Sequence, residues 1–126
     1  MPDFSPLNSL EVALQRAQSG ELSLQEFLRL LVDSDIAVPS GGRIMSDGSG
    51  FVPLLFDKQE VKMVACFTAK ERVGSFANLA PYCLVIRGRE FLRRVPPQHG
   101  LVINPGQPVG LDITPEGLGK IVRDFA

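Results

Sequence analysis

Hydrophobic positions near the N-terminus recur with the period of a helix. The residues that set this period, three or four places apart, are Leu7, Leu10, Leu14 and Ala17. They predict an amphipathic helix over residues 8–19. Asn8 or Ser9 can cap its start, and Gly20 can end it in the left-handed conformation. A second helix is expected directly afterwards, because Ser23-Leu24-Gln25-Glu26 has the form of a capping box.

After the second helix, apolar positions alternate or run together, which is typical of strands. The expected strands cover residues 36–39, 53–56, 61–67, 82–87, 101–103 and 109–113. Residues 57–60 would form a polar four-residue turn between the second and third of them. The third strand is almost continuously apolar, so we expect it to be covered on both faces. Pro39 lacks an N–H donor, which predicts that the first strand lies at an edge or ends there.

Helix signals also occur among and after these strands. Residues 68–71, Thr-Ala-Lys-Glu, form a second capping box and predict a helix start. A short helix is expected around 89–95, ended by two prolines. Thr114 can cap a last helix that has Pro115 in its first position.

These elements together predict the α+β class. We expect a single mixed β-sheet of about five or six strands with helices packed against it. A helical pair would lie at the N-terminus and one helix at the C-terminus. No linker or repeat divides the chain, so residues 1–126 are expected to form a single domain.

Composition and charge narrow the classes of function. The chain is 44% hydrophobic and 21% charged, which is ordinary for a globular protein. No apolar run approaches the ~18 residues that span a bilayer, and the start lacks the form of a signal peptide. We therefore expect a cytoplasmic protein that binds no membrane. A pI near 5.8 argues against a nucleic-acid partner.

The inventory of catalytic groups is sparse. His99 is the one histidine, and its position between a helix and a strand predicts an exposed loop residue, although a catalytic or ligand role stays open. Cys66 and Cys83 each lie in an apolar run and are expected to be buried, reduced thiols. Their spacing from each other and from His99 is unlike that of structural zinc sites. We expect no metal, no cofactor and no enzymatic activity.

Two polar segments could bind a ligand or a partner. The glycine-rich loop at 40–50 lacks the Lys-Ser/Thr pair of a phosphate-binding loop, which favours a mobile surface loop. Four arginines give segment 87–94 a net charge of +3 despite Glu90. They are Arg87, Arg89, Arg93 and Arg94. Either they form a solvated helix face, or they are a docking patch for an acidic partner.

Several motifs together resemble the SseB N-terminal domain family of bacterial proteins. The most specific are Phe67-Thr68, where a strand meets a predicted helix, and Asn104-Pro105-Gly106, which fits a type II turn. The resemblance covers about residues 8–125 and implies a bacterial, cytosolic α+β domain without implying a reaction. Thr68 and Asn104 have two interpretations: a cap and a turn that set the structure, or side chains that line a cleft at the strand ends.

These observations favour binding over turnover. The first hypothesis is a protein-interaction domain with an acidic partner, for example a toxin-neutralising immunity protein or an adaptor; this rests on analogy of fold. The alternative is an amino-acid-linked regulatory domain that binds a small molecule. Its cleft would use the 40–50 loop, Thr68 and Asn104.

Overall fold

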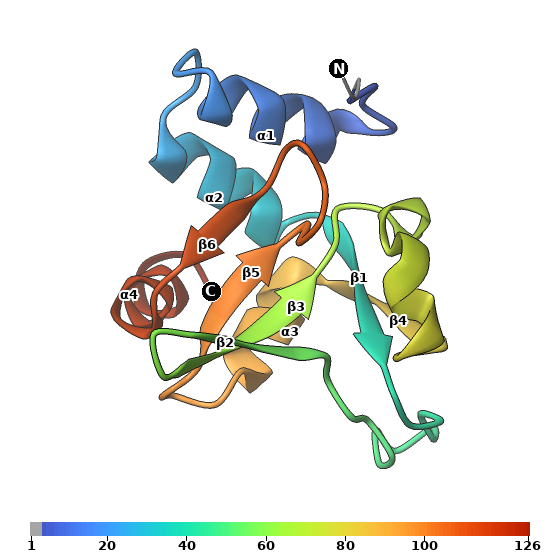
Figure 1. Ribbon diagram of the computed structural model, residues 1–126. Coiled ribbons are helices and arrows are strands. Elements are labelled where there is room, and N and C mark those ends of the chain that lie inside the picture. Colours follow the sequence, from blue (N-terminus) through green and yellow to red (C-terminus); the bar gives the residue numbers. More distant parts are fainter. Residues whose placement is uncertain (1–3) are drawn as a thin grey trace.

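The computed structural model describes residues 4–126, which form four α-helices, two 3₁₀-helices and six strands (Figure 1). The α-helices are α1 (Ser9–Gln18), α2 (Leu24–Val32), α3 (Gly88–Arg94) and α4 (Pro115–Phe125), and the 3₁₀-helices are η1 (Lys70–Arg72) and η2 (Gly74–Asn78). The strands are β1 (Asp35–Ser40), β2 (Leu55–Lys58), β3 (Val61–Cys66), β4 (Tyr82–Arg87), β5 (Gly100–Ile103) and β6 (Leu111–Ile113). The predicted α+β class and its terminal helices are confirmed.

The strands form two sheets where a single sheet was expected. One has the order β2-β3-β5-β6, in which only β3 and β5 are parallel, and the other is the antiparallel pair β1-β4. The two sheets meet where Ala37 and Phe67 exchange backbone hydrogen bonds of 2.9 and 2.8 Å. On the same edge of β3, two residues before Phe67, the Ala65 N–H donates to the carbonyl oxygen of Leu54. Because β2 and the residues just before it occupy most of this edge, β1 pairs with β3 only beyond its C-terminal end.

The core is divided by the alternation of side chains along β3 and β5. Val64 and Cys66 face the α-helices, whereas Met63, Ala65 and Phe67 face the other side, where η2 supplies Phe76. In Figure 1, α3 lies behind the four-stranded sheet, and α4 lies at the left beside it. Every residue from 63 to 67 is at most 4% exposed, so the expected covering of this strand on both faces is confirmed.

Three of the predicted helix caps are present. The Asn8 side chain accepts a hydrogen bond from the Glu11 N–H, the Ser23 hydroxyl accepts one from Glu26, and that of Thr114 accepts one from Gly117. The predicted capping box at Thr68 is wrong. Residues 70–72 form only a 3₁₀ turn without a side-chain cap, because the Thr68 hydroxyl donates to a carboxylate elsewhere.

The turn between β2 and β3 is shorter than predicted. Lys58 pairs with Val61, which leaves a loop of only Gln59 and Glu60. Both have positive φ, 52° and 68°, as the type I′ hairpin turn requires. None of the helices in residues 4–126 is long and apolar enough to cross a membrane.

Candidate functional site

Thr68 and Asn104, the two residues predicted for a cleft, lie in one buried hydrogen-bond network. They are 2% and 1% exposed. The Asn104 carboxamide oxygen accepts the Thr68 N–H at 3.0 Å, and its NH₂ group donates to the Thr68 hydroxyl at 2.9 Å and to the Val109 carbonyl at 3.2 Å. The Thr68 hydroxyl in turn donates to Glu11 at 2.6 Å. The network therefore joins α1, the end of β3 and the turn after β5.

Glu11 is the centre of this network and is fully buried. Arg72 forms an ion pair with it, donating from Nε at 2.9 Å and from Nη2 at 2.8 Å, and the Leu7 N–H donates at 2.9 Å. Burial alone would raise the pKa of Glu11, but the hydrogen bonds from Arg72, Thr68 and Leu7 together hold that pKa below its usual value of 4.5. The carboxylate is therefore ionised at neutral pH.

This geometry favours the structural interpretation of Thr68 and Asn104. A pocket of about 610 Å³ lies beside the turn at residues 104–108, but every polar side-chain atom of Asn104 already has a partner. Thr68 does not line that pocket. The sequence prediction missed Glu11 and Arg72. One signal was available, since Glu11 falls on the apolar face of its helix.

Three of the four predicted arginines bind inside the chain. Arg89 donates to the Phe125 carbonyl at 2.6 Å and to the Asp33 carboxylate at 2.7 Å, and Arg93 donates to the Ala126 carbonyl. Arg87 donates to the Asp33 carbonyl at 2.7 Å. These contacts satisfy carbonyl groups after α2 and at the end of α4, where cations are favoured.

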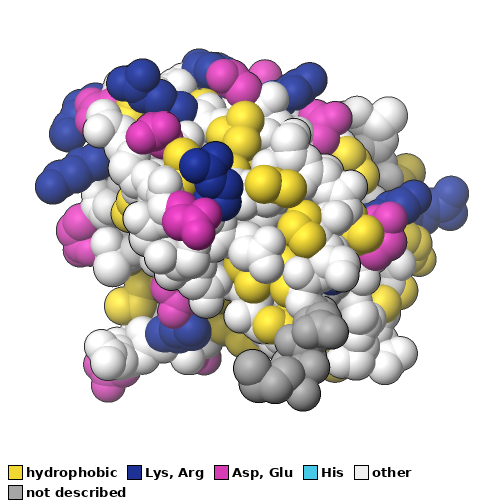
Figure 2. Space-filling view, turned by 90° about the horizontal axis from the view of Figure 1, so that it is seen from above, with side chains coloured by type: hydrophobic (Ala, Val, Ile, Leu, Met, Phe, Trp, Pro, Cys, Tyr) yellow, Lys and Arg dark blue, Asp and Glu magenta, His cyan; other side chains and the backbone are white. Residues whose placement is uncertain are grey.

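Arg94 is the fourth arginine and is placed differently. Its side chain is 71% exposed and has one ion pair, with Glu90 at 3.6 Å. It also lines a pocket (below). The four arginines therefore do not act as one free patch, and Arg94 is the one whose charge is most available to a partner. The surface on the α1 side likewise shows acidic and basic side chains interspersed (Figure 2).

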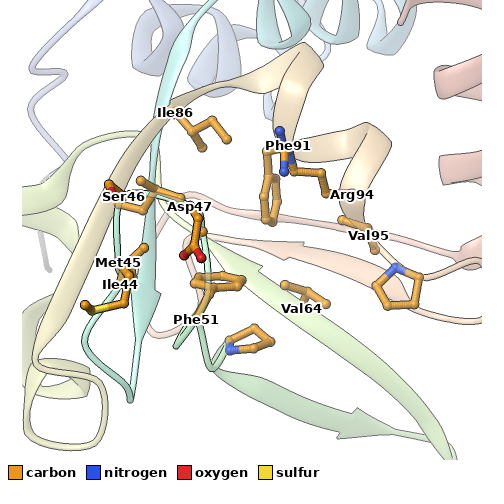
Figure 3. A pocket seen from close by; sticks show the side chains of 14 residues that line it. Ile44, Met45, Ser46, Asp47, Phe51, Val64, Ile86, Phe91, Arg94 and Val95 are labelled. Carbon is orange, nitrogen blue, oxygen red and sulfur yellow. The ribbon is translucent and has the colours of Figure 1, made fainter.

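A pocket of about 460 Å³ lies between the glycine-rich loop, β4 and α3 (Figure 3). We call it the loop pocket. Its apolar lining comes from Ile44, Met45, Phe51, Pro53, Val64, Leu84, Ile86, Phe91, Val95 and Pro96. Asp47 and Arg94 are the two charged residues of its lining. Hydrogen bonds from Ser49 hold the pKa of Asp47 below its usual value, so this carboxylate is ionised at neutral pH.

The glycines of residues 40–50 fold this loop back on itself. A Cβ on Gly42 would lie 2.3 Å from the Gly50 carbonyl oxygen, and Gly50 has φ of +84°. The glycines thus permit close backbone approach. The loop lies on the surface, as predicted, and it forms a wall of the loop pocket.

The outer edge of β4 carries backbone groups without a partner among residues 4–126. The N–H and C=O of Ala37 bind Phe67, so they point away from β4. Ala37 and Val85 are therefore a non-hydrogen-bonded pair of this antiparallel ladder, and the N–H and C=O of Val85 point away from β1. The backbone groups of Cys83 and Arg87, two residues to either side of Val85, also point outward. The groups of the residues between them point to β1, and in the same alternation the Gly88 N–H donates to the Ser34 carbonyl at 2.7 Å.

Cys83 is exposed, which corrects the expectation of two buried thiols. Its side chain lies on the strand face opposite Leu84 at an edge, where no further strand covers it. Burial raises the pKa of the Cys83 thiol, partly offset by a hydrogen bond with Val38 and by the nearby charge of Lys70. Cys66 is buried as expected, and burial raises its pKa to about 12.

His99 is half-buried, where an exposed loop residue was expected. It lines a small pocket of about 270 Å³ with Pro96, Leu118 and Val122, and its Nδ1 is buried without a partner. Arg93 is the one other ionisable residue of that lining, which includes no nucleophile or carboxylate. Within residues 4–126 there is no group of three or more His, Cys, Asp or Glu side chains that could hold a metal ion.

The fold and these sites define a small α+β domain with a surface pocket beside an open sheet edge. A family model described as the SseB protein N-terminal domain matches residues 10–120 of the 126. The chain belongs to this family, which confirms the resemblance carried by Phe67-Thr68 and Asn104-Pro105-Gly106. No curated protein and no solved structure matches the chain.

Proposed function

We propose that this chain is a protein-interaction domain of the bacterial cytosol that binds an acidic partner at the loop pocket. The observation that carries the proposal is the pocket itself, an apolar hollow of about 460 Å³ open to the surface. Such hollows receive the anchoring side chains of a partner. Binding without turnover is the expected activity.

The surroundings of the loop pocket support a protein as the occupant. Met45 in its lining is 54% exposed, and Tyr82, on the same face of β4 as the lining residues Leu84 and Ile86, is 43% exposed. Grouped exposed apolar residues are a common mark of interaction surfaces. Arg94 adds a positive charge at the rim, and arginine is enriched among the residues that dominate binding energy.

Two forms of this function are a toxin-neutralising immunity protein and an adaptor. The immunity form predicts a toxin gene directly upstream and tight, stoichiometric binding of its product. An adaptor would bind two different proteins. Reading the neighbouring gene and testing its product for binding separates the two.

The proposal is tested by selecting binders from a phage-displayed library of random peptides of about ten residues, the length of a long strand. We expect enriched peptides that combine acidic and apolar residues. Met45→Glu and Arg94→Glu should each weaken their binding about tenfold or more, since either change alters the pocket rim.

Matched controls are available for both variants. Leu24→Glu changes an apolar residue of similar exposure, 51%, on α2, and Arg123→Glu changes an arginine 70% exposed on α4. Both should bind the peptides like the wild type. Absence of any enriched peptide, or equal losses in the controls, would contradict the proposal.

A second candidate function is binding of an amino-acid-like ligand in the loop pocket. It is favoured by one observation: the lining combines an apolar wall with one anionic and one cationic side chain, Asp47 and Arg94. These charges could bind an ammonium group and a carboxylate. The expected result is a raised Tm with at least one of the standard amino acids, lost in Asp47→Asn. A flat response to all of them would exclude this candidate.

A further inference from the structure

The outer edge of β4 offers a ready-made partner for another strand. Val85 lies in a pair whose backbone groups point away from β1, and Cys83 and Arg87 follow the same phase. Unpaired N–H and C=O groups along a strand are a template for adding an extended segment. The solvent exposure of these residues is consistent with an uncovered edge, because Val85 is 57% exposed and Cys83 is also exposed.

This edge has little of the protection that sheet edges usually carry. Between Tyr82 and Ile86 the strand has no charge, no glycine and no proline. Charged residues, prolines and bulges are the usual devices that prevent edge pairing. Arg87 supplies a charge only at the end of the strand, so β4 remains open along most of its length.

The loop pocket adjoins the same edge. Leu84 and Ile86 line it from β4, and both point to one face of the strand. In an added antiparallel strand, side chains opposite them would have their Cβ atoms about 5 Å away. One of those side chains would therefore lie at the mouth of the pocket, where an apolar group would be buried.

The charges around the edge select an acidic segment. Lys70 lies near Cys83, and Arg94 lies at the rim of the loop pocket. Arg87, at one end of the outer edge, is already paired with Asp35 at 3.4 Å. Lys70 has no ion pair among the described residues 4–126, and Arg94 has only its long contact with Glu90. Acidic residues of a partner strand would meet Lys70 and Arg94.

We propose that β4 binds an extended acidic segment of a partner protein as an added strand, with an apolar side chain in the loop pocket. This inference rests on the proposed function and specifies its binding mode. Backbone pairing supplies affinity, and the pocket with Lys70 and Arg94 supplies specificity.

The test uses the peptides selected above and the variant Val85→Pro. Proline removes the outward N–H of Val85 and leaves the pairing with β1 in place, since that N–H does not take part in it. Val85→Thr is the matched control, because it keeps the N–H and the branched shape. We expect Val85→Pro to weaken peptide binding about fivefold to tenfold and Val85→Thr to leave it within about twofold.

Cys83 provides a second readout in the unmodified protein. Its exposed thiol should react with a maleimide, whereas the buried Cys66 should not. A bound peptide strand should slow the labelling of Cys83. Equal Tm values for Val85→Pro and Val85→Thr show that a loss of binding is local.

The outcomes separate this inference from the proposed function. Normal binding by Val85→Pro with weak binding by Met45→Glu would overturn strand addition and leave the interaction domain standing. Failure to select any peptide would overturn both. A dimer of the chain that Val85→Pro dissociates would show that a second copy occupies the edge, which also overturns the inference.

Discussion

Glu11 connects three parts of the chain: the segment before α1, the end of β3 and η1. Its carboxylate accepts hydrogen bonds from Leu7, Thr68 and Arg72, and it has no exposed surface. A buried carboxylate is tolerated only with such partners, and loss of one side of a buried ion pair commonly costs about 3–5 kcal/mol. The guanidinium group of Arg72 also lies over the Phe4 ring, with its Cζ 4.0 Å from the ring centroid. The network therefore specifies how the N-terminal segment packs.

Glu11→Gln should lower the free energy of unfolding by about 3 kcal/mol at neutral pH, because a carboxylate oxygen becomes a donor facing donors. Since the pKa of Glu11 is lowered in the folded protein, its contribution is fully present above about pH 5 and is lost as pH falls through the folded value. The difference between wild type and variant should shrink towards about pH 3 in urea titrations. A constant difference would contradict the assignment of the charge.

At the scale of elements, local sequence predicted most boundaries and missed the contacts between elements. The caps at Asn8, Ser23 and Thr114 are local patterns and were predicted correctly. The predicted cap at Thr68 was wrong because the Thr68 hydroxyl binds the distant Glu11 carboxylate on α1 instead of a nearby backbone N–H. The two-residue turn was also missed, since Gln59 and Glu60 are not the residues usually found with positive φ.

The hairpin turn between β2 and β3 can be improved. Replacing Gln59 with Asn and Glu60 with Gly should raise the free energy of unfolding by about 0.5–1 kcal/mol, because Asn-Gly adopts the type I′ turn with less strain. Denaturant unfolding measures the gain. The control Gln59→Ala keeps the strain and should not stabilise the fold. A double variant no more stable than the wild type would show that this turn is not strained.

The packing of α3 on α2 depends on Gly88. A Cβ there would lie 2.1 Å from the Leu31 carbonyl oxygen, so Gly88→Ala must push the two helices apart. We expect a loss of about 2–3 kcal/mol in thermal unfolding. Gly119 is the matched control, because its Cβ would meet nothing within 4 Å and alanine there favours α4. Equal effects of the two substitutions would contradict this packing.

At the scale of the whole molecule, the sequence predicted the class and about five or six strands but not their division into two sheets. That division follows from β2 and β1 sharing one edge of β3, which joins residues far apart in the chain. The same arrangement leaves the other edge of β4 open and brings the glycine-rich loop beside α3. The loop pocket and the open edge are products of topology, so local patterns could not reveal them. The arginine cluster was visible, but its partners Asp33 and Phe125 were not.

Backbone amide exchange in the protein with and without a selected peptide tests strand addition at β4 most directly. The account predicts fast exchange of the Cys83, Val85 and Arg87 amides in the free protein and protection of them in the complex. The Leu84 and Ile86 amides, which face β1, should be protected in both states. Slow exchange of Val85 in the free protein, or no change in its rate on binding, would contradict the account.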